Sequence, residues 1–188
     1  MIKKGSKLID QLSPNEKKEY LRERELKKLE RSNADKVLRR FASQIKETGF
    51  IRTKPTFFVR ENNLIAEFIH IHKYSFGPYF RIHTCIRVLN DSREFIALIG
   101  PIEKDFKAGK YKFEYESSIE SVEICANEMA TFVKKESESW YQQWSDRNSL
   151  LQDNSPLHDQ DKLYLKEAIL GESVKSNVLR SKNLLKIK

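Results

Sequence analysis

The fold is decided by residues 56–101, TFFVRENNLIAEFIHIHKYSFGPYFRIHTCIRVLNDSREFIALIGP. β-Branched and aromatic residues are crowded in this stretch, and turn residues interrupt them at short intervals, which is typical of a strand meander. Connections this short cannot make the crossover that parallel strands need, so the strands should be antiparallel neighbours. The predicted strands are residues 56–60, 64–74, 79–89 and 95–99.

The alternation of side chains fixes a register between the second and third predicted strands. If the loop at residues 75–78 closes the hairpin, the cross-strand pairs are Tyr74 with Tyr79, His72 with Arg81, His70 with His83 and Phe68 with Cys85. One face is then mostly apolar and should form the core: Ile65, Glu67, Ile69, Ile71, Phe80, Ile82, Thr84, Ile86 and Val88. The other face mixes rings, imidazoles and guanidiniums: Ala66, Phe68, His70, His72, Tyr74, Tyr79, Arg81, His83, Cys85 and Arg87. A slip of one residue would mix the two sets and bury arginine, so this register is favoured. Glu67, on the apolar face, should lie near a rim or be paired.

Length and composition favour one domain with appended polar segments. The chain has 188 residues, of which 39% are hydrophobic and 33% charged. No apolar run is long enough to span a bilayer, so we expect no membrane association. Two cysteines form neither a disulfide framework nor a metal-binding spacing, which favours a reducing, cytoplasmic location.

The net charge of +8 is concentrated at the two ends of the chain. Residues 1–54 contain 16 Lys and Arg against 8 Asp and Glu, and residues 171–188 contain 5 against 1. The middle, residues 55–170, contains 14 against 18 and is mildly acidic. Basic ends can bind phosphate backbones or an acidic protein, although such ends are more often solvated helices.

Capping signals divide the chain into an N-terminal extension, a core domain and a C-terminal extension. Ser13, Pro14 and Glu16 form a capping box that opens a charged helix in an N-terminal extension, residues 1–31. A core domain follows at residues 32–147, with a helix capped by Ser32 or Asn33 and a long helix opened by a capping box at residues 117–120. Residues 148–188 should form a helical, basic C-terminal extension, with one helix ended by Gly171.

Trp140, Tyr141 and Trp144 lie on the outer half of the predicted long helix. The sequence does not show whether these rings are buried in the core, so two interpretations of them stay open. These rings can pack against another part of the same chain, or they can form a patch that binds a partner, because aromatic residues are enriched at interfaces.

The sharpest candidate site is the polar face of the hairpin. His70 and His72 point the same way on one strand and His83 lies across from them, so the three imidazoles could hold a metal ion. No carboxylate that would orient them occurs on that face, and histidines on half-exposed sheets are usually surface residues. Without metal, Arg81, Arg87 and the histidines could bind an anion or an acidic partner, with Tyr74 and Tyr79 adding planar contact area.

Signatures of common enzymes are absent from the sequence. It contains no phosphate-binding loop, dinucleotide fingerprint, HExxH, CxxC or GxSxG. Cys85 and His83 point alike on one strand, so they are poorly placed for proton transfer, and Cys85 is better explained as structural. We therefore favour a protein that is not an enzyme and uses no cofactor.

The central region resembles a bacterial domain-of-unknown-function family, the one numbered 4304. The resemblance covers about residues 35–101 and lies in Gly49-Phe50, Thr56-Phe57, Arg60, Phe68 and the pattern Lys73-x-Ser75-x-Gly77-x-x-Phe80 leading to Ile82 and Ile86. It implies a small intracellular α+β protein with no catalytic residues to carry over. Small solitary domains of this kind also resemble immunity proteins, which neutralise a partner toxin.

Taken together, the sequence predicts an α+β fold, in which helices cover one face of an antiparallel meander of four to five strands, with helical extensions at both ends. The leading hypothesis for function is a non-catalytic, immunity-like module that binds another protein. Its predicted binding surface is His70, His72, Tyr74, Tyr79, Arg81, His83, Arg87, Trp140 and Trp144. The second hypothesis is nucleic-acid association through the basic termini, and the third is a metal-dependent enzyme centred on His70, His72 and His83.

Overall fold

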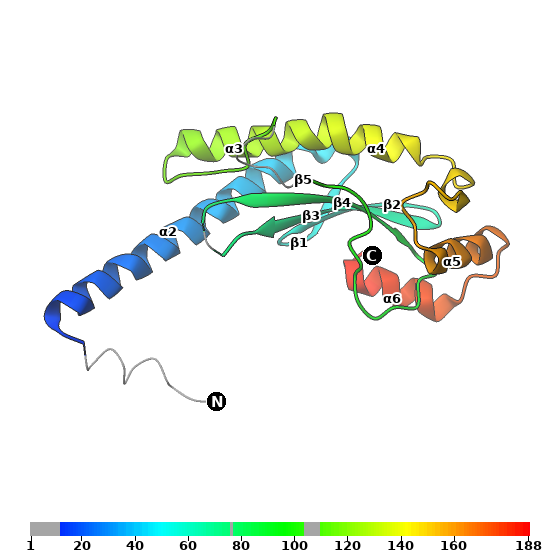
Figure 1. The fold of residues 1–188 in the computed structure, drawn as a ribbon, viewed down its shortest axis with the longest axis horizontal. Helices are drawn as coiled ribbons and strands as arrows, with labels where there is room; N and C mark the ends of the chain where they lie inside the picture. The colour runs from blue at the N-terminus through cyan, green and yellow to red at the C-terminus, as the bar shows by residue number, and fades with distance from the viewer. Residues whose placement is uncertain (1–11, 76, 104–109) are drawn as a thin grey trace.

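The computed structural model describes residues 12–75, 77–103 and 110–188, and it has the predicted α+β architecture (Figure 1). An antiparallel sheet has the strand order β1-β2-β3-β4-β5, which is the meander expected from the short connections. The first eleven residues of the predicted N-terminal extension lie outside the described residues. The elements in chain order are α2 (Pro14–Gln44), η1 (Lys46–Thr48), β1 (Ile51–Lys54), β2 (Phe57–Asn62), β3 (Ile65–Lys73), β4 (Phe80–Val88), β5 (Ile102–Glu103), α3 (Ile119–Phe132), η2 (Val133–Ser137), α4 (Glu138–Gln143), η3 (Ser149–Leu151), α5 (Asp159–Ile169) and α6 (Lys175–Leu185).

The predicted register of the central hairpin is confirmed. In the pairing of β3 with β4, His72 lies opposite Arg81, His70 opposite His83 and Phe68 opposite Cys85. The hairpin closes through a hydrogen bond from the Tyr74 amide to the Tyr79 carbonyl, 3.0 Å long. The apolar and polar side chains therefore separate onto opposite faces of the sheet, as the alternation requires.

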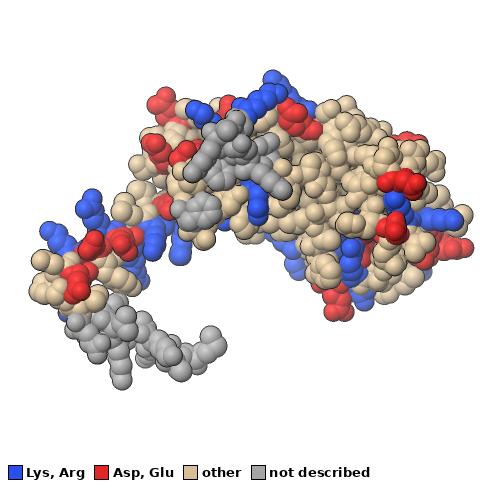
Figure 2. Space-filling model, viewed as in Figure 1, with Lys and Arg blue, Asp and Glu red and all other residues tan. Residues whose placement is uncertain are grey.

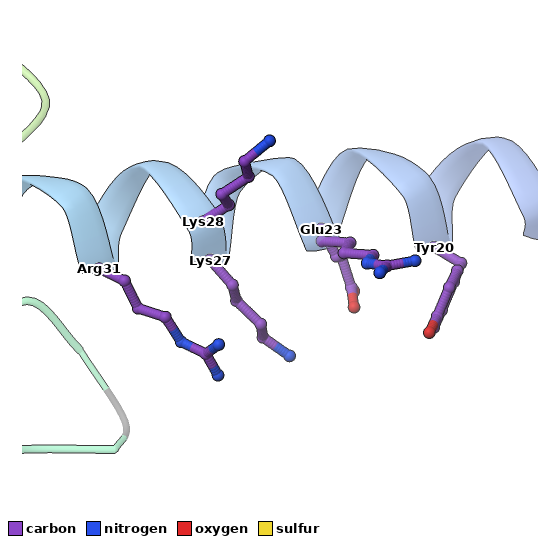
Figure 3. Close-up of a pocket in the computed structure, with 6 residues that line it drawn as sticks. Tyr20, Glu23, Lys27, Lys28 and Arg31 are labelled. Carbon is purple, nitrogen blue, oxygen red and sulfur yellow. The ribbon is translucent and has the colours of Figure 1, made fainter. Parts of the chain in front are cut away.

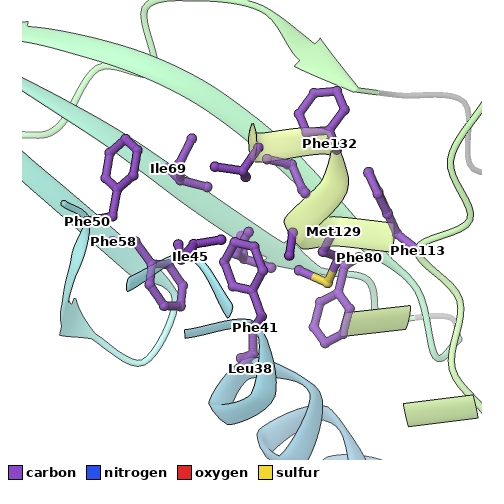
Figure 4. Close-up of a cluster of buried hydrophobic side chains, with 14 of the residues drawn as sticks. Leu38, Phe41, Ile45, Phe50, Phe58, Ile69, Phe80, Phe113, Met129 and Phe132 are labelled. Atoms are coloured by element: carbon purple, nitrogen blue, oxygen red, sulfur yellow. The ribbon is translucent and has the colours of Figure 1, made fainter. Parts of the chain in front are cut away.

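The apolar face of the sheet forms the main core with α2 and α3 (Figure 4). Phe41 of α2 and Phe58 of β2 meet edge to face, with ring centroids 4.8 Å apart. Burying one such phenylalanine stabilises the fold by about 1.5–3 kcal/mol. Glu67 is paired on this face, as predicted, because Arg60 approaches its carboxylate to 2.7 Å.

The N-terminal helix differs from the prediction in its length. The capping box is confirmed, since the Ser13 hydroxyl accepts from the Glu16 amide and the Glu16 carboxylate accepts from the Ser13 amide. The helix boundary expected at Ser32 or Asn33 is wrong, because α2 continues for 31 residues. Asn33 does not act as a cap; it is buried, and its side-chain amide donates to the Glu116 carbonyl.

The last predicted strand, residues 95–99, is also wrong. This segment meets β4 at its end, where the Ile86 amide donates to the Ile99 carbonyl. Just beyond it the Thr84 amide donates to the Pro101 carbonyl, in the register that β5 continues. Gly100 between them has φ +140°, and a Cβ at this position would lie 2.1 Å from the Thr84 carbonyl oxygen. Only glycine permits this close approach of the segment to β4. A strand that was not predicted, β1, pairs with β2 instead.

The long helix after Ser118 is continuous but contains one π-helical turn. Ser118, one residue later than expected, caps α3 by accepting from the Ser121 amide. The helix passes through the π-helical turn η2 into α4. Ser137 in this turn is buried and forms a 2.7 Å hydrogen bond with Thr84 of β4, so the turn is fixed to the sheet.

The C-terminal segment packs against the second face of the sheet (Figure 1). Leu185 of α6 is fully buried in a small second core, together with Val59, Ala66, Phe68, Cys85 and Leu89. The expectation that helices cover one face only therefore needs correction. Residues 172–188 are an integral part of the fold, because α6 buries apolar side chains of β2, β3 and β4.

Candidate functional site

The half of the second sheet face nearest the β3–β4 hairpin is the candidate site. Figure 1 shows α6 beneath the opposite end of the sheet and no described helix beneath this end. The remaining polar side chains of the face gather here, and we call them the open sheet face: His70, His72, Tyr74, Tyr79, Arg81 and His83.

Aromatic and cationic groups are in contact across this face. The rings of His70 and His83 lie 5.5 Å apart between centroids, and the Phe57 ring lies 4.5 Å from that of His70. The Arg81 guanidinium lies over the Tyr74 ring at 5.4 Å. These contacts align the side chains of three strands into one surface with planar groups and positive charge, which suits recognition of an anionic partner.

Several nitrogen atoms of this face are buried without a hydrogen-bond partner in the described part of the chain. They are Nδ1 of His70, Nε of Arg81, and Nδ1 and Nε2 of His83. His83 is only 4% exposed, whereas His70 and Arg81 are partly exposed. Native proteins leave few buried polar groups unsatisfied, so a concentration of them on one surface indicates a function.

The electrostatic environment keeps the imidazoles neutral. Burial, followed by the nearby positive charges, lowers the pKa of His70 and that of His83 to about 4. Burial and then Arg81 lower the pKa of His72 as well. At neutral pH the charge of this face therefore comes from Arg81 and the adjacent lysines.

The sequence analysis did not predict two lysines that contribute to the open sheet face, Lys54 and Lys186. Lys54 of β1 places its ammonium 4.7 Å from the centre of the Phe57 ring, and its pKa is lowered by burial and by the nearby Lys186. The alternation in residues 51–54 was the available signal for β1. The approach of Lys186, by contrast, depends on the packing of α6, which no local pattern indicates. Within the described ranges, neither Arg81 nor Lys54 has an ion-pair partner.

The remaining residues of the predicted surface lie elsewhere or have other partners. Tyr79 hydrogen-bonds with Glu114, which raises the pKa of the Tyr79 hydroxyl. Trp140 and Trp144 are partly buried against the main core, on the other side of the sheet. This packing corresponds to the first of the two interpretations of these rings. Between them, Tyr141 is buried and donates its hydroxyl proton to the Phe68 carbonyl at 2.9 Å.

Arg87 is not a surface residue, and its assignment to the binding surface is wrong. It is 2% exposed and lies under α6, where its Nε donates to the Ser181 hydroxyl at 2.9 Å. Its other nitrogens donate to the backbone carbonyls of Phe95 and Arg93 and pair with the buried carboxylate of Asp91. Arg87 therefore fixes the segment after β4 to the C-terminal helix.

The three histidines do not form the metal centre considered above. Among residues 12–75, 77–103 and 110–188, no group of three or more His, Cys, Asp or Glu side chains is arranged to hold a metal ion. The two thiols are also unsuited to nucleophilic chemistry. Cys85 and Cys125 are buried, and burial raises the pKa of each thiol well above its usual value.

The basic ends of the chain differ in their availability. In α6, Lys182 pairs with Glu61 at 2.7 Å and Arg180 donates to the Ser92 carbonyl, so these charges are used within the fold. The first half of α2 projects beyond the sheet and carries a mixture of both signs of charge (Figure 2). A shallow hollow of about 440 Å³ along it is lined by one helix alone, with Tyr20, Lys27 and Arg31 pointing to the same side (Figure 3).

In the part of the chain that the structure describes, no helix has both the length and the apolar character needed to cross a bilayer.

Comparisons with known proteins give no assignment for this site. No family model, no curated protein and no solved structure matches the chain. The resemblance to the family numbered 4304 stays a prediction.

Proposed function

We propose that this protein is a non-catalytic module that binds another protein through the open sheet face. The observation that carries the proposal is the set of buried nitrogens on His70, Arg81 and His83 that have no hydrogen-bond partner among the described residues, beside an aromatic and positively charged surface. Such a surface has the composition of a recognition site, in which planar rings supply contact area and charge supplies specificity. Binding without chemistry is consistent with an immunity-like role, in which the module occupies its partner.

We place this function in the cytoplasm. Cys85 and Cys125 are both unpaired and buried in separate parts of the core, which is the usual state of cysteines in a reducing compartment.

The test places a negative charge on the open sheet face. Tagged full-length chain is used to capture proteins from the native host, with His72→Glu and Arg81→Glu as separate variants and Arg39→Glu as the matched control. Arg39 is exposed on α2, away from this face. We expect one partner to be captured by the unchanged chain and by Arg39→Glu, and to be lost with either face variant. Retention of every captured protein by both face variants would refute the proposal.

Nucleic-acid binding is the second candidate, and the basic side of the projecting α2 favours it. Arg24, Lys27, Lys28 and Arg31 line one open hollow there, with Glu23 as its one acidic residue. Binding through these residues should weaken steeply with salt, because each phosphate contact releases a counterion. Titration of labelled DNA and RNA at two salt concentrations tests it, and absence of salt-dependent binding would exclude this candidate.

A further inference from the structure

The cluster formed by His70, Arg81 and His83 has more hydrogen-bonding groups than partners within residues 12–75, 77–103 and 110–188. His70 and His83 are directly opposite on β3 and β4, and Arg81 lies two residues from His83 on the same side of the sheet. A buried polar group without a partner costs about 1–3 kcal/mol. The fold therefore carries an unfavourable arrangement that a ligand with acceptor atoms would relieve.

We propose that this cluster is a receptor for a carboxylate, supplied by an Asp or Glu side chain of the protein partner. The inference rests on the proposed function and names the chemical group that the open sheet face recognises. A guanidinium offers a planar set of donors that matches a carboxylate, and a neutral imidazole can donate one further hydrogen bond. Arg81 supplies the charge, and His70 and His83 supply neutral donors.

The charges around the cluster favour a protein carboxylate over a nucleic-acid strand. A strand presents one phosphate after another and needs a row of free cations. Near the hairpin, Lys73 is already paired with Glu30 at 2.7 Å. Among the residues that the structure describes, the cations left on the face are Arg81 and Lys54, with Lys186 near Lys54. One central guanidinium flanked by uncharged imidazoles matches a single negative charge.

Access to the cluster is from its partly exposed side. His72 and Arg81 are partly exposed, and His83 is the buried member. A carboxylate can therefore approach the partly exposed side chains of Arg81 and His70, and the His83 ring lies beside that of His70, with centroids 5.5 Å apart. Arg81 is a binding residue in this arrangement, while the imidazoles set the position of the second carboxylate oxygen.

The test follows the imidazole resonances of the full-length chain by nuclear magnetic resonance. The probes are a triglutamate peptide, a triglutamine peptide of the same size without charge, and a short thymidine oligonucleotide. We expect saturable shifts of the His70 and His83 signals with triglutamate and none with triglutamine. Arg81→Gln should weaken triglutamate binding by about tenfold or more, as loss of a charge-assisted pair predicts, while Arg39→Gln should leave it unchanged.

Two further outcomes have definite meanings. Arg81→Lys keeps the charge without the planar fork, so weaker binding by this folded variant supports the carboxylate geometry. Saturation by the oligonucleotide at lower concentration than by triglutamate would overturn the inference in favour of nucleic acid. A lack of saturable shifts with either anion would also overturn it. In that case the capture experiment with His72→Glu and Arg81→Glu still decides separately whether the face binds a protein.

Discussion

Replacing His83 by leucine should make the free protein more stable while it removes carboxylate binding. His83 is buried, with only 4% of its surface exposed, and both of its ring nitrogens lack hydrogen-bond partners within the described chain. Leaving such groups unsatisfied costs about 1–3 kcal/mol, and leucine, with a similar volume and no polar atoms, avoids this cost. We therefore expect the free energy of unfolding to rise by about 1–3 kcal/mol at neutral pH.

The assay is urea unfolding at neutral pH, with thermal unfolding as a second measurement. For a chain of this size each kcal/mol corresponds to roughly 2–4 °C in Tm. His72→Leu is the matched control, because His72 is on the same face but partly exposed, and its change should stay within about 0.5 kcal/mol. Loss of stability in His83→Leu, or equal effects of both substitutions, would refute the argument that the ring nitrogens of His83 are unsatisfied.

Three further predictions concern pH and the buried polar network. The pKa values of His70 and His83 are lowered to about 4, so as pH falls below 6.5 the unfolded chain takes up protons first. The contribution of these two histidines to the free energy of unfolding should therefore be constant above pH 6.5 and decrease between pH 6.5 and 4. The decrease is at most about 1.4 kcal/mol per pH unit for each imidazole. It is smaller for His70, which is partly exposed, because solvent screens its charge. Urea unfolding across this range should show a shallower decrease for His83→Leu, and an equal slope would contradict the assignment. Arg87→Met should cost about 1–3 kcal/mol in the same assay, because the Phe95 and Arg93 carbonyls lose their donor, while the Asp91 carboxylate keeps Arg93 as its partner; an unchanged free energy of unfolding would show that Arg87 is dispensable. Tyr141→Phe should cost about 1–2 kcal/mol, since its hydroxyl bonds the backbones of β3 and β4, and unchanged unfolding would argue against those bonds.

The predictions that were confirmed depend on interactions between residues that are close together in the chain. The pairing of His70 with His83 follows from side-chain alternation and one short turn, because a slip of one residue would exchange the two faces. The capping box at Ser13 and the helix end at Gly171, which has φ +80°, depend on groups within a few residues of each other. For such features the sequence contains nearly all the relevant interactions.

The features that were missed depend on contacts between residues far apart in the chain. Asn33 looks like a helix cap, but its partner is a carbonyl 83 residues away, so α2 passes through it. Arg87 looks like a surface residue until Ser181 and the rest of α6 cover it. The sequence by itself determined which side chains share the second face of the sheet. Only the tertiary structure decided which of them α6 buries and which stay open, because that depends on where a separate helix finds apolar area to cover.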